Sequence, residues 1–130
     1  MKKIVLLVGV ERYSTYAEVL KNAGYAVLEV QSEAEVYKLW PKPGFGLMLI
    51  DETFTNWVVV INWLVRNQYA GPTILLTSKA NRLLETCRNN KLMNFNTVVV
   101  CDKNINIEVM PSIISTIVEI GMINECELVN

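Results

Sequence analysis

The sequence of 130 residues contains no histidine. Without an imidazole, the chain cannot use a histidine general base or a Ser-His-Asp triad, and it lacks a very common ligand of zinc. It also has no glycine-rich loop leading from a strand into a helix, because Gly44 and Gly46 come before an apolar run instead. These absences count against zinc-dependent and nucleotide-dependent catalysis, so we expect a protein that is not an enzyme.

Cysteines are few and show no functional spacing. Cys87, Cys101 and Cys126 match neither a metal-binding nor a redox motif. The odd number of cysteines and the lack of a signal peptide favour a reducing, cytoplasmic location. The longest apolar stretch, residues 57–65, is interrupted by Asn62 and is too short to cross a bilayer.

The charges are nearly balanced, with 12 basic and 13 acidic residues and a net charge of −1. This balance gives no electrostatic reason to expect nucleic acid or an anionic membrane as a partner. Apolar residues make up 52% of the chain, which is enough for one well-formed core. We therefore expect one domain over residues 1–121, followed by a short tail over 122–130.

Short apolar runs alternate with segments of helical periodicity along the whole chain. The apolar runs predict strands at 3–8, 25–30, 46–50, 73–77 and 97–101. The helical segments are 12–23, 32–39, 55–67, 81–91 and a last one that starts near Ile107. Ser32 and Glu35 form a capping-box pattern at the start of the second helical segment. Five strands alternating with five helices predict an α/β fold with a doubly wound parallel sheet.

Polar residues follow three of these predicted strands. Asp51 and Glu52 follow the run 46–50, Thr77 stands at the end of 73–77, and Lys103 comes shortly after 97–101. The carboxyl ends of parallel strands share one edge of the sheet, where ligands usually bind. A carboxylate there can attack phosphorus, while a hydroxyl and an ammonium can stabilise phosphoryl oxygens. The structural alternative is an ion pair between Asp51 and Lys103, with Thr77 only closing a turn.

This arrangement resembles the receiver domain of two-component response regulators over roughly residues 2–120. The resemblance rests on the (βα)5 order and on four short matches: Asn22-Ala23-Gly24-Tyr25, Leu49-Ile50-Asp51, Thr77-Ser78 and Lys103. It implies a flavodoxin-like sheet with strand order 2-1-3-4-5. It also implies that Asp51 accepts a phosphoryl group from the phosphohistidine of a partner kinase with the help of Mg²⁺, and that Thr77 and Lys103 stabilise the group.

The sequence departs from the receiver pattern at several positions. Receivers carry an acidic pair after the first strand, which helps to bind Mg²⁺, whereas this chain has Val8-Gly9-Val10 there. The remaining candidate metal ligands are Asp51, Glu11 and Glu52. The residue after the lysine is Asn104 rather than proline, and Val100 replaces the aromatic switch residue. We therefore expect a degenerate receiver, or pseudo-receiver, that keeps the scaffold and part of the site.

The helical segment 55–67 is apolar on nearly all sides. Trp57, Val60, Ile61 and Leu64 can face the sheet, which leaves Val59 and Trp63 pointing outward. Either neighbouring helices cover these two side chains, or they belong to a surface for a partner or a second copy of the chain.

Three hypotheses follow. The first is a receiver-like signalling domain that accepts a phosphoryl group on Asp51. The second is an interaction module of the same fold that works without phosphorylation through its helical surface, with a histidine kinase, another signalling protein or a second copy as partner. The third is a small flavodoxin-like ligand-binding protein or enzyme, which the missing histidine and phosphate loop disfavour.

Overall fold

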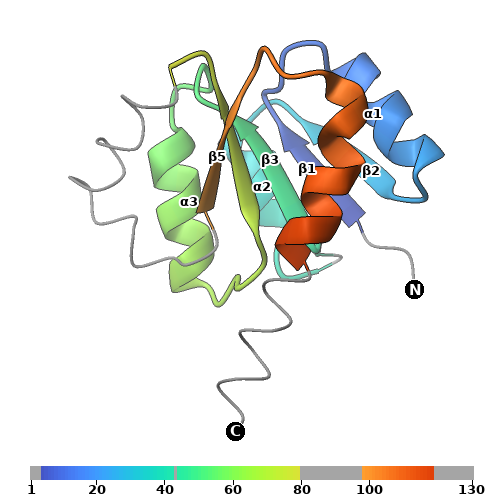
Figure 1. Ribbon diagram of the computed structural model, residues 1–130. Coiled ribbons are helices and arrows are strands. Elements are labelled where there is room, and N and C mark those ends of the chain that lie inside the picture. The colour runs from blue at the N-terminus through green and yellow to red at the C-terminus, as the bar shows by residue number, and fades with distance from the viewer. Residues whose placement is uncertain (1–3, 43, 80–97, 119–130) are drawn as a thin grey trace, which may run out of the picture.

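Strands and helices alternate along the chain in the computed structural model, which describes residues 4–42, 44–79 and 98–118 (Figure 1). The elements are β1 (Ile4–Val8), α1 (Tyr13–Asn22), β2 (Ala26–Val30), α2 (Glu33–Leu39), β3 (Leu47–Asp51), α3 (Trp57–Arg66), β4 (Thr73–Thr77), β5 (Val98–Asp102) and the 3-10 helix η2 (Ile107–Val109). A further helix over 110–118 follows η2 directly. Each predicted strand is present, and its ends differ from the prediction by at most one residue.

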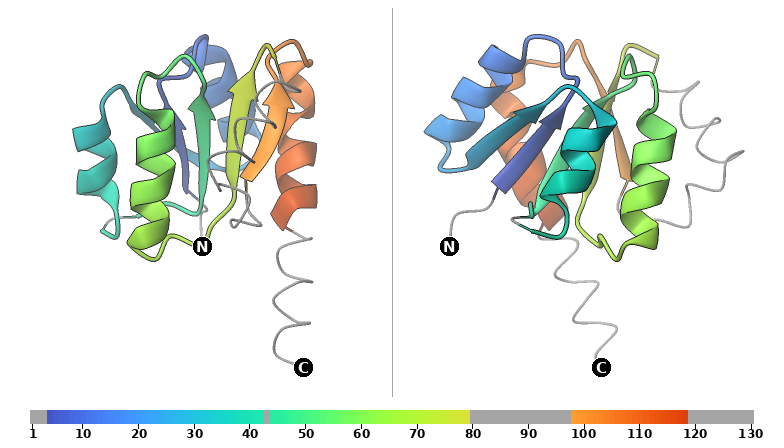
Figure 2. Two further views of the ribbon diagram at one scale, coloured as in Figure 1. Left: turned by 90° about the vertical axis from the view of Figure 1, so that its left-hand side faces the viewer. Right: turned by 180° about the vertical axis from the view of Figure 1, so that it is seen from behind.

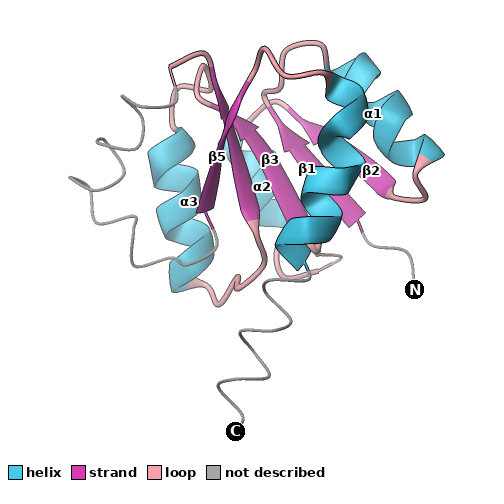
Figure 3. Cartoon of the chain, viewed as in Figure 1, coloured by secondary structure: helices cyan, strands magenta, loops and turns pink. Residues whose placement is uncertain are grey.

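The five strands form one parallel sheet in the order β2-β1-β3-β4-β5, as predicted (Figure 3). All neighbouring strands are parallel, so their carboxyl ends lie along one edge. The strand order reverses between β1 and β3, which are adjacent. In the register of the sheet, Asp51 pairs with Leu76, and Thr77 pairs with Asp102. The ends of β3, β4 and β5 are therefore level with one another.

Helices cover both faces of the sheet (Figure 2). On one face, α2 and α3 pack against Leu6, Met48, Ile50 and Leu75. On the other, α1, η2 and the 110–118 helix pack against a second set of strand residues: Val5, Leu7, Leu49, Ile74 and Leu76. The residues of β1, β3 and β4 alternate between these two cores, which explains why their sequences are apolar throughout.

The helices begin and end close to the predicted positions. Ser32 caps α2, because its hydroxyl oxygen accepts a hydrogen bond from the Glu35 N–H at 3.3 Å. The last predicted helix does start at Ile107, but its first residues form the 3-10 turn η2, and Pro111 lies in the first turn of the α-helix that follows. The predicted helix at 81–91 and the tail at 122–130 lie outside the described residues.

The all-round apolar helix α3 packs largely as predicted. Its residues Trp57, Val60, Ile61 and Leu64 are buried against the sheet. Val59 is 49% exposed, whereas Trp63 is partly covered by Tyr37 of α2, with ring centroids 4.3 Å apart. Only one of the two outward-facing side chains is therefore strongly exposed. None of the helices in the described ranges has the length and apolar character needed to cross a membrane.

Candidate functional site

Asp51 is the last residue of β3 and only 1% of its surface is exposed. The prediction that this strand ends at residue 50 was wrong by one residue, because the ladder with β4 continues through the pair of Asp51 and Leu76. The N–H of Glu52 then donates to the carbonyl oxygen of Leu76 at 3.0 Å. This extra pairing holds the carboxylate inside the sheet edge rather than beyond it.

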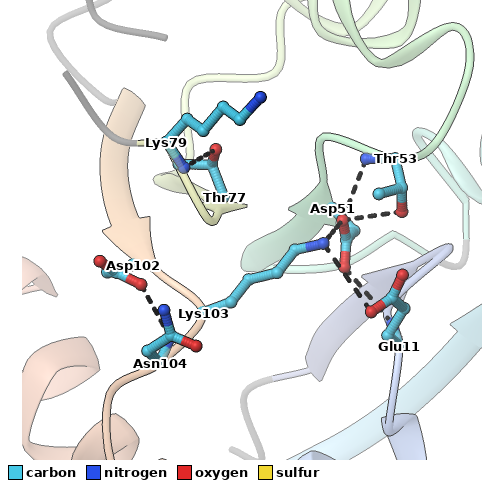
Figure 4. A network of polar contacts seen from close by, with 8 residues as sticks. All are labelled: Glu11, Asp51, Thr53, Thr77, Lys79, Asp102, Lys103 and Asn104. Atoms are coloured by element: carbon cyan, nitrogen blue, oxygen red, sulfur yellow. Dashed lines mark hydrogen bonds and ion pairs between the residues drawn. The ribbon is translucent and has the colours of Figure 1, made fainter. Parts of the chain in front are cut away.

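Four donors surround the Asp51 carboxylate (Figure 4). Oδ1 accepts hydrogen bonds from the N–H of Thr53 at 3.0 Å and from its hydroxyl at 2.8 Å. Lys103 Nζ lies 2.6 Å from the same oxygen. Oδ2 accepts a longer bond of 3.4 Å from the N–H of Glu11. The buried charge is thus compensated by one ammonium and by hydrogen bonds to both oxygens.

Lys103 reaches Asp51 from the turn that follows β5. Its N–H donates to the carbonyl oxygen of Thr77 at 2.9 Å, which extends the pairing between β4 and β5. Asp102 Oδ1 accepts a bond from the Asn104 N–H at 2.8 Å, and this local turn directs the chain at Lys103. The lysine side chain is 18% exposed and passes over the end of β4 to the carboxylate. The ion pair therefore ties the ends of β3 and β5 together.

Thr77 lies at the same edge but is fully buried. Its hydroxyl oxygen accepts a hydrogen bond from the N–H of Lys79 at 2.9 Å, which closes the turn after β4. Its backbone carbonyl is the acceptor for Lys103 described above. The three predicted residues therefore share one edge: Asp51 and Lys103 are in direct contact, and Thr77 is joined to Lys103 through the backbone.

The two other acidic candidates differ in position. The Glu11 carboxylate is 4.0 Å from Lys103 Nζ, and its side chain is 64% exposed. Glu52 is the first residue of the turn after β3, and its contact to this edge is the backbone hydrogen bond to Leu76 described above. Glu11 is thus the acid that approaches Asp51 through its backbone and Lys103 through its side chain.

Sequence reasoning missed Thr53, which donates two hydrogen bonds to Asp51. A signal was present, because an aspartate commonly accepts a hydrogen bond from the N–H two residues later. The hydroxyl adds a second bond only because this turn directs the threonine side chain back to the carboxylate.

Tyr16 of α1 and Cys101 of β5 are buried in the core below this edge. Burial raises the pKa of Tyr16, the nearby Cys101 and Asp51 raise it further, and Arg12 opposes them. Burial also raises the pKa of the Cys101 thiol, with a smaller contribution from Asp102. Both side chains are therefore uncharged at neutral pH and serve as core residues.

The loop after β1 carries no acidic side chain before Glu11, as its sequence Val8-Gly9-Val10 already indicated. Gly9 has a φ of 56°, and a Cβ atom at this position would lie 2.7 Å from Cδ1 of Phe54. The phenyl ring of Phe54 therefore lies against the backbone of Gly9. Within the described residues, no group of three His, Cys, Asp or Glu side chains is arranged to hold a metal ion.

Comparison with known proteins extends these observations. No protein-family model matches the sequence, and no curated protein matches it. Solved structures do match. The signal receiver domain of a LuxO repressor protein from Vibrio parahaemolyticus has a TM-score of 0.77 and 15% identity, covering 97% of both chains.

The chain has the receiver-domain fold.

Two further receivers support this assignment. A receiver protein from Sinorhizobium medicae has a TM-score of 0.72 and 16% identity, covering 91% of this chain and 95% of its own. A CheY-like receiver domain from Methylobacillus flagellatus has a TM-score of 0.70 and 15% identity, covering 90% of this chain and 99% of its own. In this receiver fold, Asp51, Thr77 and Lys103 occupy the carboxyl edge of the sheet, as the sequence predicted, while their chemical roles stay predictions.

Proposed function

We propose that this chain is a receiver-like signalling domain in which Asp51 accepts a phosphoryl group from the phosphohistidine of a partner kinase. The observation that carries the proposal is the contact of 2.6 Å between Asp51 and Lys103 at the carboxyl edge of the sheet. An acid at the end of β3 and a lysine in the turn after β5 meet there across β4, in a fold that matches receivers. We further propose that the protein acts in the cytoplasm through other proteins, rather than on nucleic acid or a membrane.

The proposed reaction transfers a phosphoryl group from a histidine nitrogen of the kinase to a carboxylate oxygen of Asp51. A carboxylate oxygen of Asp51 attacks phosphorus, and the bond between phosphorus and the histidine nitrogen breaks. The electron pair of that bond leaves with the imidazole, which takes up a proton from solvent. Lys103 would then turn its ammonium to the new phosphoryl oxygens, since it lies beside the attacked site and keeps partial access to water. A rearranged hydroxyl of Thr53 or Thr77 would donate to the same oxygens.

Signal output would follow from a shift between two arrangements of this edge. Lys103 leaving the carboxylate would release the tie between the ends of β3 and β5, and a partner protein that binds one arrangement better would respond.

A second candidate function is a phosphorylation-independent interaction module, or pseudo-receiver. It is favoured by the 1% exposure of Asp51 and by the donors that already occupy both carboxylate oxygens. In this case the ion pair is a structural tie, and the protein acts through its helical surface on a partner or a second copy.

Intact-mass spectrometry after incubation with a small-molecule acyl phosphate separates the two candidates. The first predicts the added mass of one phosphoryl group on the wild type and none on Asp51→Asn. Glu52→Gln is the matched control, because it removes the neighbouring carboxylate and should still be modified. An unmodified wild type, with and without Mg²⁺, would rule out phosphoacceptance and leave the interaction module.

A further inference from the structure

The inner surface of the site offers little to a divalent cation. Mg²⁺ requires an octahedron of oxygen ligands and usually keeps several of its own waters. Among the three candidate metal ligands, Asp51 is the buried one. Its Oδ1 already accepts two hydrogen bonds from Thr53 and contacts the Lys103 ammonium. A cation entering this space would have to displace the ammonium first.

The wall next to the carboxylate is apolar. The ring of Phe54 lies against Gly9, at the turn where receivers carry their acidic pair. Neither residue offers a side-chain oxygen, and the ring supplies no acceptor for the waters that a bound Mg²⁺ would keep. The neighbouring Val10 is 4% exposed and belongs to the core below the sheet.

The exposed acid that contacts both Asp51 and Lys103 is Glu11, and its carboxylate is already directed to the lysine. Glu11 Oε2 lies 4.0 Å from Lys103 Nζ, on the solvent side of the ammonium. Lys103 thus stands between two carboxylates, one buried and one exposed. This is the position that a bridging cation would need.

We propose that Lys103 is the resident cation of this site, so that the site binds no Mg²⁺ and the Asp51 carboxylate is neutralised by the chain itself. The ammonium is covalently held and always present, so the charge compensation does not depend on the cation concentration of the cell. The proposal deepens the proposed function, because phosphoryl acceptance at Asp51 would then proceed equally well without a divalent cation. Whether the site binds Mg²⁺ can be tested without any phosphoryl transfer.

The test is a titration of the purified chain with MgCl₂ to millimolar concentrations, followed by the backbone amide shifts of Gly9, Glu11 and Thr53. NaCl at the same ionic strength is the control. For the wild type, the two salts should give the same small shifts. Mn²⁺, added in trace amounts, should broaden none of these three amides selectively.

For the Lys103→Met variant we expect the opposite result, namely Mg²⁺ binding. It keeps the length of the side chain but leaves two carboxylates without their shared cation, so Mg²⁺ binding should become at least tenfold tighter than in the wild type. Lys103→Arg keeps the charge and should behave as the wild type. Should Lys103→Met fail to fold, as judged by circular dichroism, Lys103→Gln serves in its place.

Two results would overturn the proposal. One is saturable Mg²⁺ binding by the wild type with shifts centred on these amides. The other is a folded Lys103→Met or Lys103→Gln variant that binds Mg²⁺ no better than the wild type. Phosphoryl transfer is measured separately as the ratio of rates in Mg²⁺ and in EDTA, which should be close to one. A wild type that takes up no phosphoryl group contradicts the proposed function, while the titration still decides the cation question.

Discussion

The Asp51–Lys103 ion pair has one deeply buried partner and one that retains access to water. Asp51 is 1% exposed, whereas the Lys103 side chain is 18% exposed and can turn its ammonium into solvent. Removing the lysine leaves a carboxylate that cannot be rehydrated without opening the sheet edge. Removing the acid leaves an ammonium that can move outward. The two residues should therefore differ in what their loss does to stability.

We predict that Lys103→Met lowers the free energy of unfolding by about 3–5 kcal/mol, the usual cost of leaving a buried charge unpaired. Asp51→Asn should lower it by only about 1–3 kcal/mol, because the amide oxygen can still accept hydrogen bonds from Thr53 and Lys103. Urea denaturation at neutral pH, followed by circular dichroism, measures both values.

Glu11→Gln is the control for these two variants, since it changes an exposed carboxylate 4.0 Å from the same ammonium. It should change stability by less than about 1 kcal/mol, as is typical of surface ion pairs. A loss for Asp51→Asn that equals or exceeds the loss for Lys103→Met would contradict this description of the pair.

Helix α3 shows how far a single helix can be understood from its sequence alone. Val59 and Val60 are adjacent residues of the same type, but Val59 is 49% exposed and Val60 is fully buried against the sheet. We predict that Val60→Ala costs about 2–3 kcal/mol, because it removes buried methyl groups and leaves a cavity. Val59→Ala should be neutral or slightly stabilising, since alanine favours the helical backbone. Thermal and urea unfolding of the two variants provide a matched comparison.

Equal losses for the two valines would mean that Val59 is covered in solution. Self-association would then be the first explanation to examine, by sedimentation of the wild type over a range of concentrations. This outcome would support the dimer surface considered for Val59 and Trp63.

The strands were predictable because β1, β3 and β4 are buried on both faces, so each is a continuous apolar run. The edge constellation was predictable for a related reason, since parallel strands bring their carboxyl ends together. The depth of Asp51 was not predictable. It depends on whether the ladder with β4 stops at residue 50 or continues to Leu76, and this long-range pairing is not encoded in the run itself.

The hydrogen bonds of the two threonines were only partly predictable. The alternative considered for Thr77, that it closes a turn, agrees with the hydrogen bond that its hydroxyl oxygen accepts from the Lys79 N–H. The bond from the Thr53 N–H to Asp51 follows a common local pattern, whereas the second bond, from its hydroxyl, is not implied by that pattern. Both hydroxyl bonds depend on the backbone direction of a single turn, which apolar periodicity does not determine.

The Asp51–Lys103 ion pair connects the buried central strand β3 to the partly exposed edge strand β5. The central strands are almost completely buried, whereas the two edge strands β2 and β5 are only partly so. Elements with fewer buried contacts can open locally at a smaller free energy than global unfolding requires. Lys103 follows β5 and is tied to β3 across β4, whereas β2 has no comparable tie among the described residues.

We predict that Lys103→Met lowers the hydrogen-exchange protection of β5 by about tenfold more than that of β2, which corresponds to about 1.4 kcal/mol of local opening free energy. The measurement is amide exchange by NMR on the wild type and the variant, expressed as the ratio of protection in β5 to protection in β2. Because a purely global loss of stability lowers both edges alike, it leaves this ratio unchanged, and an unchanged ratio would contradict the proposed tie. A lower ratio in the variant would show that the lysine holds one edge of the sheet in place. In the proposed function, displacement of Lys103 from Asp51 would release this same edge.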